Sequence, residues 1–208
     1  MDGIIPLYKE RGMTSFACVS RLRQILKTKK IGHSGTLDPG VAGVLPICVG
    51  NATKVVDYLM QSGKQYQGEL LIGFTTTTQD LDGDKIEEKE VTNEIPTSEI
   101  LSAMNSLTGT TIQIPPMYSA VKVNGKKLYE YARAGETVER PKRQVTISKF
   151  ELLSSKYDEK NKQQRIRFNV ECSKGTYIRT LVVDLARKLG YPGVMSFVNA
   201  VEEWRLYS

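Results

Sequence analysis

The chain has 208 residues, of which 40% are hydrophobic, enough to bury one sizeable core in one large domain or two small ones. Its formal net charge of +6 favours a polyanionic partner such as a nucleic acid. The sequence excludes a membrane-spanning helix, which needs roughly 18 consecutive apolar residues. It also argues against a secretory signal, and a single histidine with three widely spaced cysteines argues for reduced, buried thiols and against a zinc site.

The first predicted element is an amphipathic helix that begins at Thr14 and Ser15. Its apolar residues recur at helical spacing, and they are Phe16, Val19, Leu22 and Ile25. The basic segment at 27–30 suits the carboxyl end of such a helix. We therefore expect one face to pack on the core and the basic end to point to solvent.

The segment Gly32–Gly40 is rich in glycine and carries the only histidine, His33, five residues before Asp38. An apolar run, Val41–Gly50, follows. A carboxylate in such a loop beside buried apolar structure can act as a nucleophile or a base. An isolated Asp-Pro-Gly is more often a turn in which the aspartate caps its own backbone, so these residues alone leave both interpretations open.

The middle of the chain predicts a strand at Gln65–Gly73, then a polar, acidic loop or hairpin at Thr75–Asn93, and a helix at Pro96–Leu107. The acidic segment contains Asp80-Leu81-Asp82-Gly83-Asp84, which is similar to a calcium loop. Lys85 stands where that loop needs glycine and Val91 where it needs glutamate, so calcium binding is rejected.

The second half predicts mostly strands joined by tight turns. The elements are a hairpin around Asn124-Gly125, a short helix at Lys127–Ala134, strands at Gln144–Leu153 and Arg165–Cys172 joined by a charged connection at Ser154–Gln164, and a last helix capped by Thr176 and ended by Gly190. Strands outnumber helices, which predicts an α+β protein with a mixed, largely antiparallel sheet.

Basic residues form three clusters along the chain. They are Lys27, Lys29 and Lys30; Lys122, Lys126 and Lys127; and Arg140, Lys142 and Arg143. Each cluster alone is typical of a solvated face, but together they predict a surface that follows a phosphate backbone.

Four blocks resemble the motifs of the TruB family of tRNA pseudouridine synthases, in the family's order and spacing from about residue 3 to about residue 198. Gly32–Gly50 resembles its G-H-x-G-T-L-D-P motif, and Lys64-Gln65-Tyr66 resembles its K-x-Y motif. Ile114–Arg133 resembles the central signature, and Cys172–Leu181 resembles the arginine motif.

The resemblance implies the pseudouridine synthase fold, a curved, mixed and mostly antiparallel sheet flanked by helices with an RNA-binding cleft. It implies one catalytic domain over 1–208. The sequence departs from the family pattern at Thr77, where the family commonly has aspartate. An atypical tail at 199–208 takes the place of the family's arginines, and the C-terminal RNA-binding extension is absent. A natural short form, a shifted reading frame and a cloning boundary would each explain this tail.

The implied activity is isomerisation of uridine to pseudouridine at position 55, in the T-loop of tRNA. The base is flipped out of the RNA, and its N1–C1′ bond is exchanged for a C5–C1′ bond. This reaction needs no cofactor and no metal. The implied partner is the T-arm of tRNA in the cytoplasm, with no membrane and no required protein partner.

The resemblance assigns roles to individual residues. Asp38 matches the catalytic aspartate and Arg179 the arginine that pairs with it. Tyr66 matches the tyrosine that stacks on the base and accepts the C5 proton. His33 matches the residue that enters the space left by the flipped nucleotide. The remaining residues expected to bind substrate are Gly35, Thr36, Lys64, Asp80, Lys126, Lys127 and Tyr177, the last as a pocket wall.

Two other functions are compatible with parts of the sequence. One is a non-catalytic protein that binds or folds tRNA, with a pocket that the altered tail keeps from closing. The other is a retaining glycosidase-like hydrolase that uses Asp38. A hydrolase of that class needs a second carboxylate as its acid, and no motif of this chain clearly supplies one.

Overall fold

The computed structural model describes residues 1–61 and 63–201. The chain divides into two compact units, which we call unit 1 (Met1–Gln67 and the chain from Val198) and unit 2 (Gly68–Phe197). Two strands, β4 (Lys64–Ile72) and β12 (Gly193–Ala200), each begin in one unit and end in the other.

Unit 1 is built on β3 (Ala42–Val49), the apolar run that follows the glycine-rich loop. β1 (Gly3–Lys9) and β2 (Ile31–His33) both pair with β3 in antiparallel register. The end of β12 pairs with β3 in parallel, Asn199 opposite Ala42 and Ala200 opposite Gly43. β3 is therefore the central strand, and its residues from Leu45 to Val49 are all buried.

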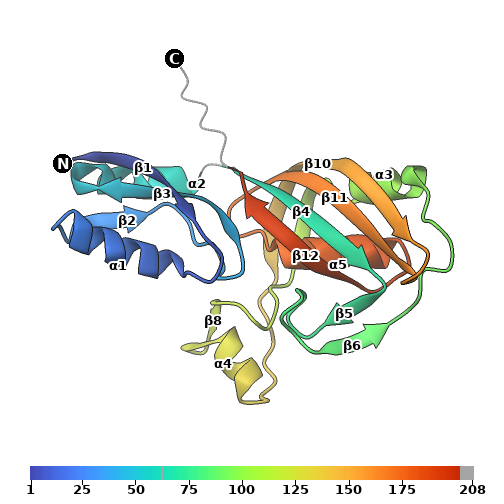
Figure 1. Ribbon diagram of the computed structural model, residues 1–208. Helices are drawn as coiled ribbons and strands as arrows, with labels where there is room; N and C mark the ends of the chain where they lie inside the picture. The colour runs from blue at the N-terminus through green and yellow to red at the C-terminus, as the bar shows by residue number, and fades with distance from the viewer. Residues whose placement is uncertain (62, 202–208) are drawn as a thin grey trace. The chain divides into compact units, whose positions relative to one another are not determined.

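The helix α1 (Ser15–Ile25) begins where the sequence predicts, because the Thr14 hydroxyl accepts a hydrogen bond from the Ala17 N–H at 3.0 Å. It lies along the strands of unit 1 (Figure 1). The predicted apolar face is partly wrong, since Phe16 and Ile25 are 65% and 64% exposed. Phe16 and Ile25 are nine residues apart and therefore lie on opposite sides of a helix with 3.6 residues per turn. A single packed face cannot bury both of them. The short helices η1 (Gly50–Val55) and α2 (Val56–Gln61) complete the unit.

Unit 2 contains a sheet in the order β12-β4-β11-β10-β7. β10 (Arg143–Asp158) is antiparallel to both β11 (Gln163–Cys172) and β7 (Gly109–Gln113). With α3 (Thr97–Ser106) and α5 (Ile178–Lys188), these strands form the core of the unit. The α+β class with a mixed, mostly antiparallel sheet is thus confirmed.

The helix α5 packs closely on the sheet of unit 2. Its apolar face is completely buried at Val182, Leu185 and Ala186. A Cβ placed on Gly193 of β12 would lie 2.4 Å from the Cβ of Ala186. Only a residue without a side chain allows this approach, which sets the distance between helix and sheet.

Two predicted boundaries in unit 2 are wrong. The segment Ser154–Gln164 is not a charged connection, because β10 continues to Asp158 and pairs with β11 as far as Gln163. Of its charged residues, Lys156 and Asp158 belong to β10, and Glu159, Lys160 and Lys162 lie in the turn between the two strands. The last helix has Tyr177 at its N-cap position with no side-chain cap, while the Thr176 hydroxyl donates to the Ser173 carbonyl at 2.8 Å.

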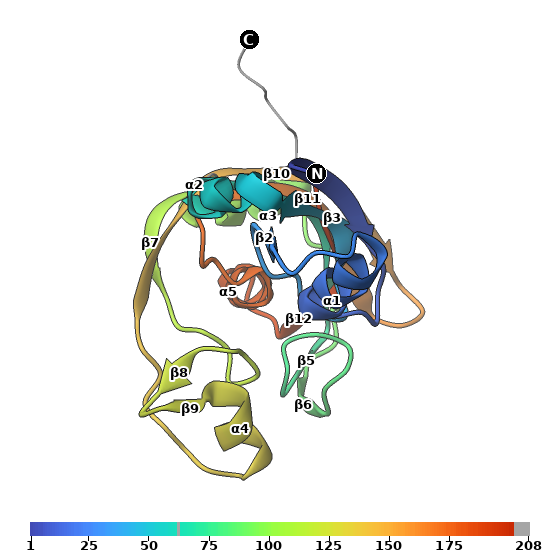
Figure 2. The ribbon, with the colours of Figure 1, turned by 90° about the vertical axis from the view of Figure 1, so that its left-hand side faces the viewer.

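Two hairpins are confirmed. β5 (Phe74–Thr76) and β6 (Lys85–Glu88) pair within the acidic segment. β8 (Lys122–Val123) and β9 (Lys126–Lys127) pair across Asn124 and Gly125, whose φ values are 50° and 81°, as a type I′ turn requires. With α4 (Leu128–Arg133), this second hairpin forms a lobe that projects from the sheet of unit 2 (Figures 1 and 2).

Candidate active site

Asp38 lies in the loop between β2 and β3 of unit 1. The Val41 N–H donates to the Asp38 carbonyl at 3.0 Å, which closes a β-turn with Pro39 at its second position. The aspartate is exposed, while its neighbour Leu37 is buried. The turn interpretation of Asp-Pro-Gly and the catalytic one are therefore compatible, since the turn holds the backbone and leaves the residue accessible.

A buried lysine lies near this loop. Lys9, at the end of β1, is completely buried, and its ammonium donates to the carbonyls of Met13 (2.9 Å) and Glu10 (3.2 Å). Burial lowers the pKa of Lys9, and the nearby Cys18 and Asp38 side chains oppose that shift. The sequence analysis missed this residue, although a lysine that ends an apolar strand was a visible signal.

Four residues expected to bind or react with substrate surround one small cavity in unit 1. Gly35 and Thr36 line it from the loop, and Lys64 and Tyr66 line it from β4. Lys64 and Tyr66 are two residues apart on a strand, so their side chains lie on the same face. The cavity measures about 40 Å³, close to the volume of one water molecule. Such a cavity is too small to enclose a nucleotide base.

Ala200 completes the wall of this cavity. Its backbone lies so near β3 that a Cβ on Gly43 would lie 2.5 Å from the Ala200 carbonyl oxygen, and Gly43 has a φ of +143°. The first residues of the atypical tail, 199–201, are thus part of unit 1. The remaining positions of that tail, 202–208, lie outside the described residues.

His33 ends β2, and the residue is half-buried. Its Nδ1 atom is buried and has no hydrogen-bond partner among the described residues. The ring is therefore not held by a hydrogen bond at this nitrogen. Its expected role, stacking in the space of the flipped nucleotide, stays a prediction.

Arg179 occupies the first turn of α5, in unit 2, as the sequence predicts. One terminal nitrogen donates to the Thr78 carbonyl at 2.9 Å and contacts Oδ2 of Asp80 at 3.4 Å. The other donates to the Tyr118 carbonyl at 2.8 Å. The side chain is buried. Through these contacts its guanidinium links α5 to the loop at 78–80 and to Tyr118, all within unit 2. The pairing of Arg179 with Asp38, a residue of unit 1, stays a prediction.

Asp80 is held from several sides within its loop. Its carboxylate accepts hydrogen bonds from the Thr78 hydroxyl and from the Asp82 N–H, the latter at 3.1 Å. The Thr77 N–H donates to the Asp84 carbonyl at 3.0 Å. Thr77, which stands where the family commonly has aspartate, therefore belongs to a well-bonded loop.

Tyr177 is positioned by a residue that the sequence analysis missed. The buried Gln113, at the end of β7, accepts from the Tyr177 N–H at 2.7 Å and donates to its carbonyl at 3.1 Å. These two bonds orient the start of α5. No local pattern marks Gln113, because its partner is 64 residues away in the chain.

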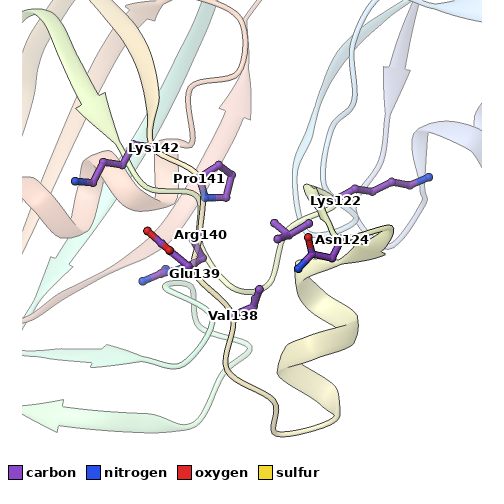
Figure 3. A pocket seen from close by; sticks show the side chains of 8 residues that line it. Lys122, Asn124, Val138, Glu139, Arg140, Pro141 and Lys142 are labelled. Carbon is purple, nitrogen blue, oxygen red and sulfur yellow. The ribbon is translucent and has the colours of Figure 1, made fainter.

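Two of the predicted basic clusters meet in a shallow pocket of about 680 Å³ in unit 2. Lys122, Arg140 and Lys142 line it together with Glu139, and Figure 3 shows the two lysines on opposite sides. Arg140 also donates to the Pro115 carbonyl at 3.0 Å. The structure thus brings three cations of two separate sequence clusters to one pocket.

The two lysines that the sequence predicted to bind RNA make contacts inside the projecting lobe. Lys126 forms an ion pair with Glu136 at 2.8 Å and lies 4.6 Å from the centre of the Tyr131 ring. Lys127 lies 5.4 Å from the centre of the Tyr129 ring. Their charges are thus partly engaged by the protein itself.

The described residues contain no group of three or more His, Cys, Asp or Glu side chains that could hold a metal ion. No helix within 1–61 and 63–201 is long and apolar enough to cross a membrane. The cysteines Cys18, Cys48 and Cys172 are all buried and free of disulfides.

Comparison with known proteins identifies the family to which this chain belongs. The model of the TruB family pseudouridylate synthase, N-terminal domain, matches residues 23–178. The tRNA pseudouridine synthase B of Limosilactobacillus reuteri is 94% identical over 202 residues, which cover 97% of this chain and 67% of that protein. The one from Latilactobacillus sakei is 61% identical, over 94% of this chain and 65% of that protein.

Solved structures agree on the fold. A chain of a Cbf5-Nop10-Gar1 complex matches with a TM-score of 0.68 and 30% identity, over 96% of this chain and 48% of that one. A chain of an H/ACA RNP bound to a substrate RNA containing 2′-deoxyuridine matches with a TM-score of 0.67 and 26% identity, over 97% and 47%.

The chain spans about two thirds of the length of the curated relatives and about half that of the solved chains. The match of the family model includes the glycine-rich loop with Asp38, the K-x-Y strand and the central signature. The resemblance recognised from the four sequence blocks is confirmed, and the chain belongs to the TruB family of pseudouridylate synthases, which are isomerases.

Proposed function

We propose that this chain isomerises uridine to pseudouridine in tRNA, at the T-loop uridine of position 55, in the cytoplasm. The relatives from Limosilactobacillus reuteri and Latilactobacillus sakei are both tRNA pseudouridine synthases B. Their high identity supports a tRNA substrate. The single observation that carries the proposal is the exposed Asp38 on a closed turn of unit 1, inside the segment that matches the family model.

The proposed reaction conserves every atom of the uridine. The base flips out of the RNA, the N1–C1′ bond breaks, the uracil rotates, and C5 bonds to C1′. C5 then loses its proton, and N1 gains one. Asp38 acts as the catalytic carboxylate, either at C1′, at the base or on the C2′ proton. Tyr66 stacks on the base and accepts the C5 proton.

The positions of the other residues support their proposed roles in this reaction. Gly35, Thr36 and Lys64 line the same cavity as Tyr66, which suits residues that contact the flipped nucleotide. Arg179 and Asp80 are held in one hydrogen-bonded network, and Tyr177 begins the same helix as Arg179. Lys126, Lys127 and the basic pocket with Lys122 and Lys142 would contact phosphates of the T-arm.

Tritium release from C5-labelled uridine in a tRNA transcript tests the proposal, because isomerisation replaces the C5 proton by a bond to C1′, whereas binding or glycosidic hydrolysis leaves that proton in place. We expect release stoichiometric with the uridine at position 55 and none from a transcript with cytidine there. Tight tRNA binding without release would instead indicate a tRNA-binding or tRNA-folding protein. Release of free uracil would indicate a hydrolase.

A further inference from the structure

We infer that Ser15 is a positioning residue for Asp38, which it holds in place through the peptide group that precedes the aspartate. The inference rests on the proposed function, because it assumes that Asp38 reacts with the substrate. All the contacts that support it lie within unit 1.

Ser15 is the first residue of α1 and is only 3% exposed. Its hydroxyl accepts a hydrogen bond from the Leu37 N–H at 3.0 Å and donates to the Leu37 carbonyl at 3.3 Å. The Leu37 carbonyl belongs to the peptide unit that contains the Asp38 nitrogen. One side chain therefore fixes the plane of the peptide from which Asp38 extends.

A second tether binds the other side of the aspartate. The Gly12 N–H donates to the Pro39 carbonyl at 2.8 Å. The turn that carries Gly12 is itself held by the buried Lys9 ammonium, which donates to the Met13 carbonyl. The segment 12–15 thus binds the catalytic loop both before and after Asp38.

The loop needs these tethers for a physical reason. Asp38, Pro39 and Gly40 are all exposed, so packing does not hold them. Glycines widen the range of backbone conformations open to such a loop. A reacting group displaced by about 1 Å can lose roughly a hundredfold in rate. Hydrogen bonds from a rigid helix start would restrict the aspartate to the productive geometry.

The adjacent residue provides a matched control. Thr14 caps α1 through the Ala17 N–H but is exposed, and among the described residues its side chain makes no hydrogen bond to the loop. Thr14→Ala and Ser15→Ala should both lower Tm, because each removes a bond at the start of the same helix. Only Ser15→Ala also frees the Leu37 peptide.

The measurement is single-turnover tritium release from C5-labelled tRNA with the full chain at saturating enzyme, together with Kd for the tRNA. We expect Ser15→Ala to lower the rate constant by roughly 10- to 100-fold, with Kd within about twofold of wild type. Thr14→Ala should change the rate constant less than about twofold. Ser15→Cys, whose thiol is a weak donor and acceptor, should fall between serine and alanine.

A Ser15→Ala chain whose rate constant lies within about threefold of wild type would overturn the inference. So would a Thr14→Ala chain slowed as much as Ser15→Ala. If Ser15→Ala does not fold, the Ser15→Cys chain decides, since a wild-type rate in that variant also contradicts the role. An Asp38→Asn chain as active as wild type would contradict the proposed function itself. An inactive Asp38→Asn chain together with a fully active Ser15→Ala chain would contradict the inference alone.

Discussion

Unit 1 and unit 2 hold their principal charged residues in different ways. In unit 1, Asp38 is exposed, and bonds to the backbone around it hold it in place. In unit 2, Arg179 is buried, and its own guanidinium makes the bonds that hold neighbouring segments together. A substitution at Asp38 should therefore remove chemistry and spare the fold, whereas a substitution at Arg179 should affect both.

The largest effect is expected for Asp38→Asn. The amide keeps the shape of the side chain but loses the charge and nucleophilicity of the carboxylate. We expect tritium release to fall by about a thousandfold or more, with tRNA affinity and Tm near wild type. Residual turnover within about tenfold of wild type, equivalent to only about 1.4 kcal/mol in the barrier, would exclude the catalytic role of Asp38.

Tyr66→Phe should have the next largest effect. The phenyl ring keeps the wall of the cavity and the stacking surface but has no hydroxyl to assist the loss of the C5 proton. We expect tRNA binding to persist and product formation to fall by about a hundredfold. The matched variant is Tyr66→Leu, which removes the ring as well. A fully active Tyr66→Phe beside an inactive Tyr66→Leu would limit the tyrosine to stacking.

Arg179→Lys tests the structural role of the buried cation in unit 2. A lysine keeps the charge but cannot reproduce the planar fork that reaches the carbonyls of Thr78 and Tyr118 together. We expect the free energy of unfolding to fall by about 1–3 kcal/mol, because a half-buried carbonyl loses its donor. Urea titration measures this loss, and an unchanged midpoint would show that the network contributes little to stability.

The smallest effects are expected in the basic pocket, where charge reversal should change binding and not chemistry. The double variant Lys122→Glu with Lys142→Glu should weaken tRNA affinity by about tenfold and flatten its salt dependence, since fewer counterions are released. Lys126→Gln should cost less, because Glu136 already pairs with that ammonium. Measuring Kd as a function of salt concentration compares these variants with wild type. An equal slope of log Kd against log salt for wild type and all variants would exclude the pocket from RNA contact.

Local signals in the sequence identified most elements of unit 2 and the first helix of unit 1. Asn124-Gly125 sets its own turn through positive φ values, and Thr14 caps the helix that follows it. The strands of unit 1 were harder to predict. β3 is buried along almost its whole length, so its sequence shows an apolar run without the alternation that marks a half-buried strand. The pairing of β12 with β3 joins residues more than 150 positions apart.

The sequence by itself determined the family, the α+β class and the candidate site residues, because motif composition and side-chain periodicity are local properties of the chain. Only the tertiary structure decided which residues support these candidates within each unit. Ser15 reaches Leu37 across 22 positions, Gln113 reaches Tyr177 across 64, and Arg179 reaches Thr78 across 101. A hydrogen bond depends on positions in space, and no periodicity records which distant backbone group a serine, a glutamine or an arginine will meet.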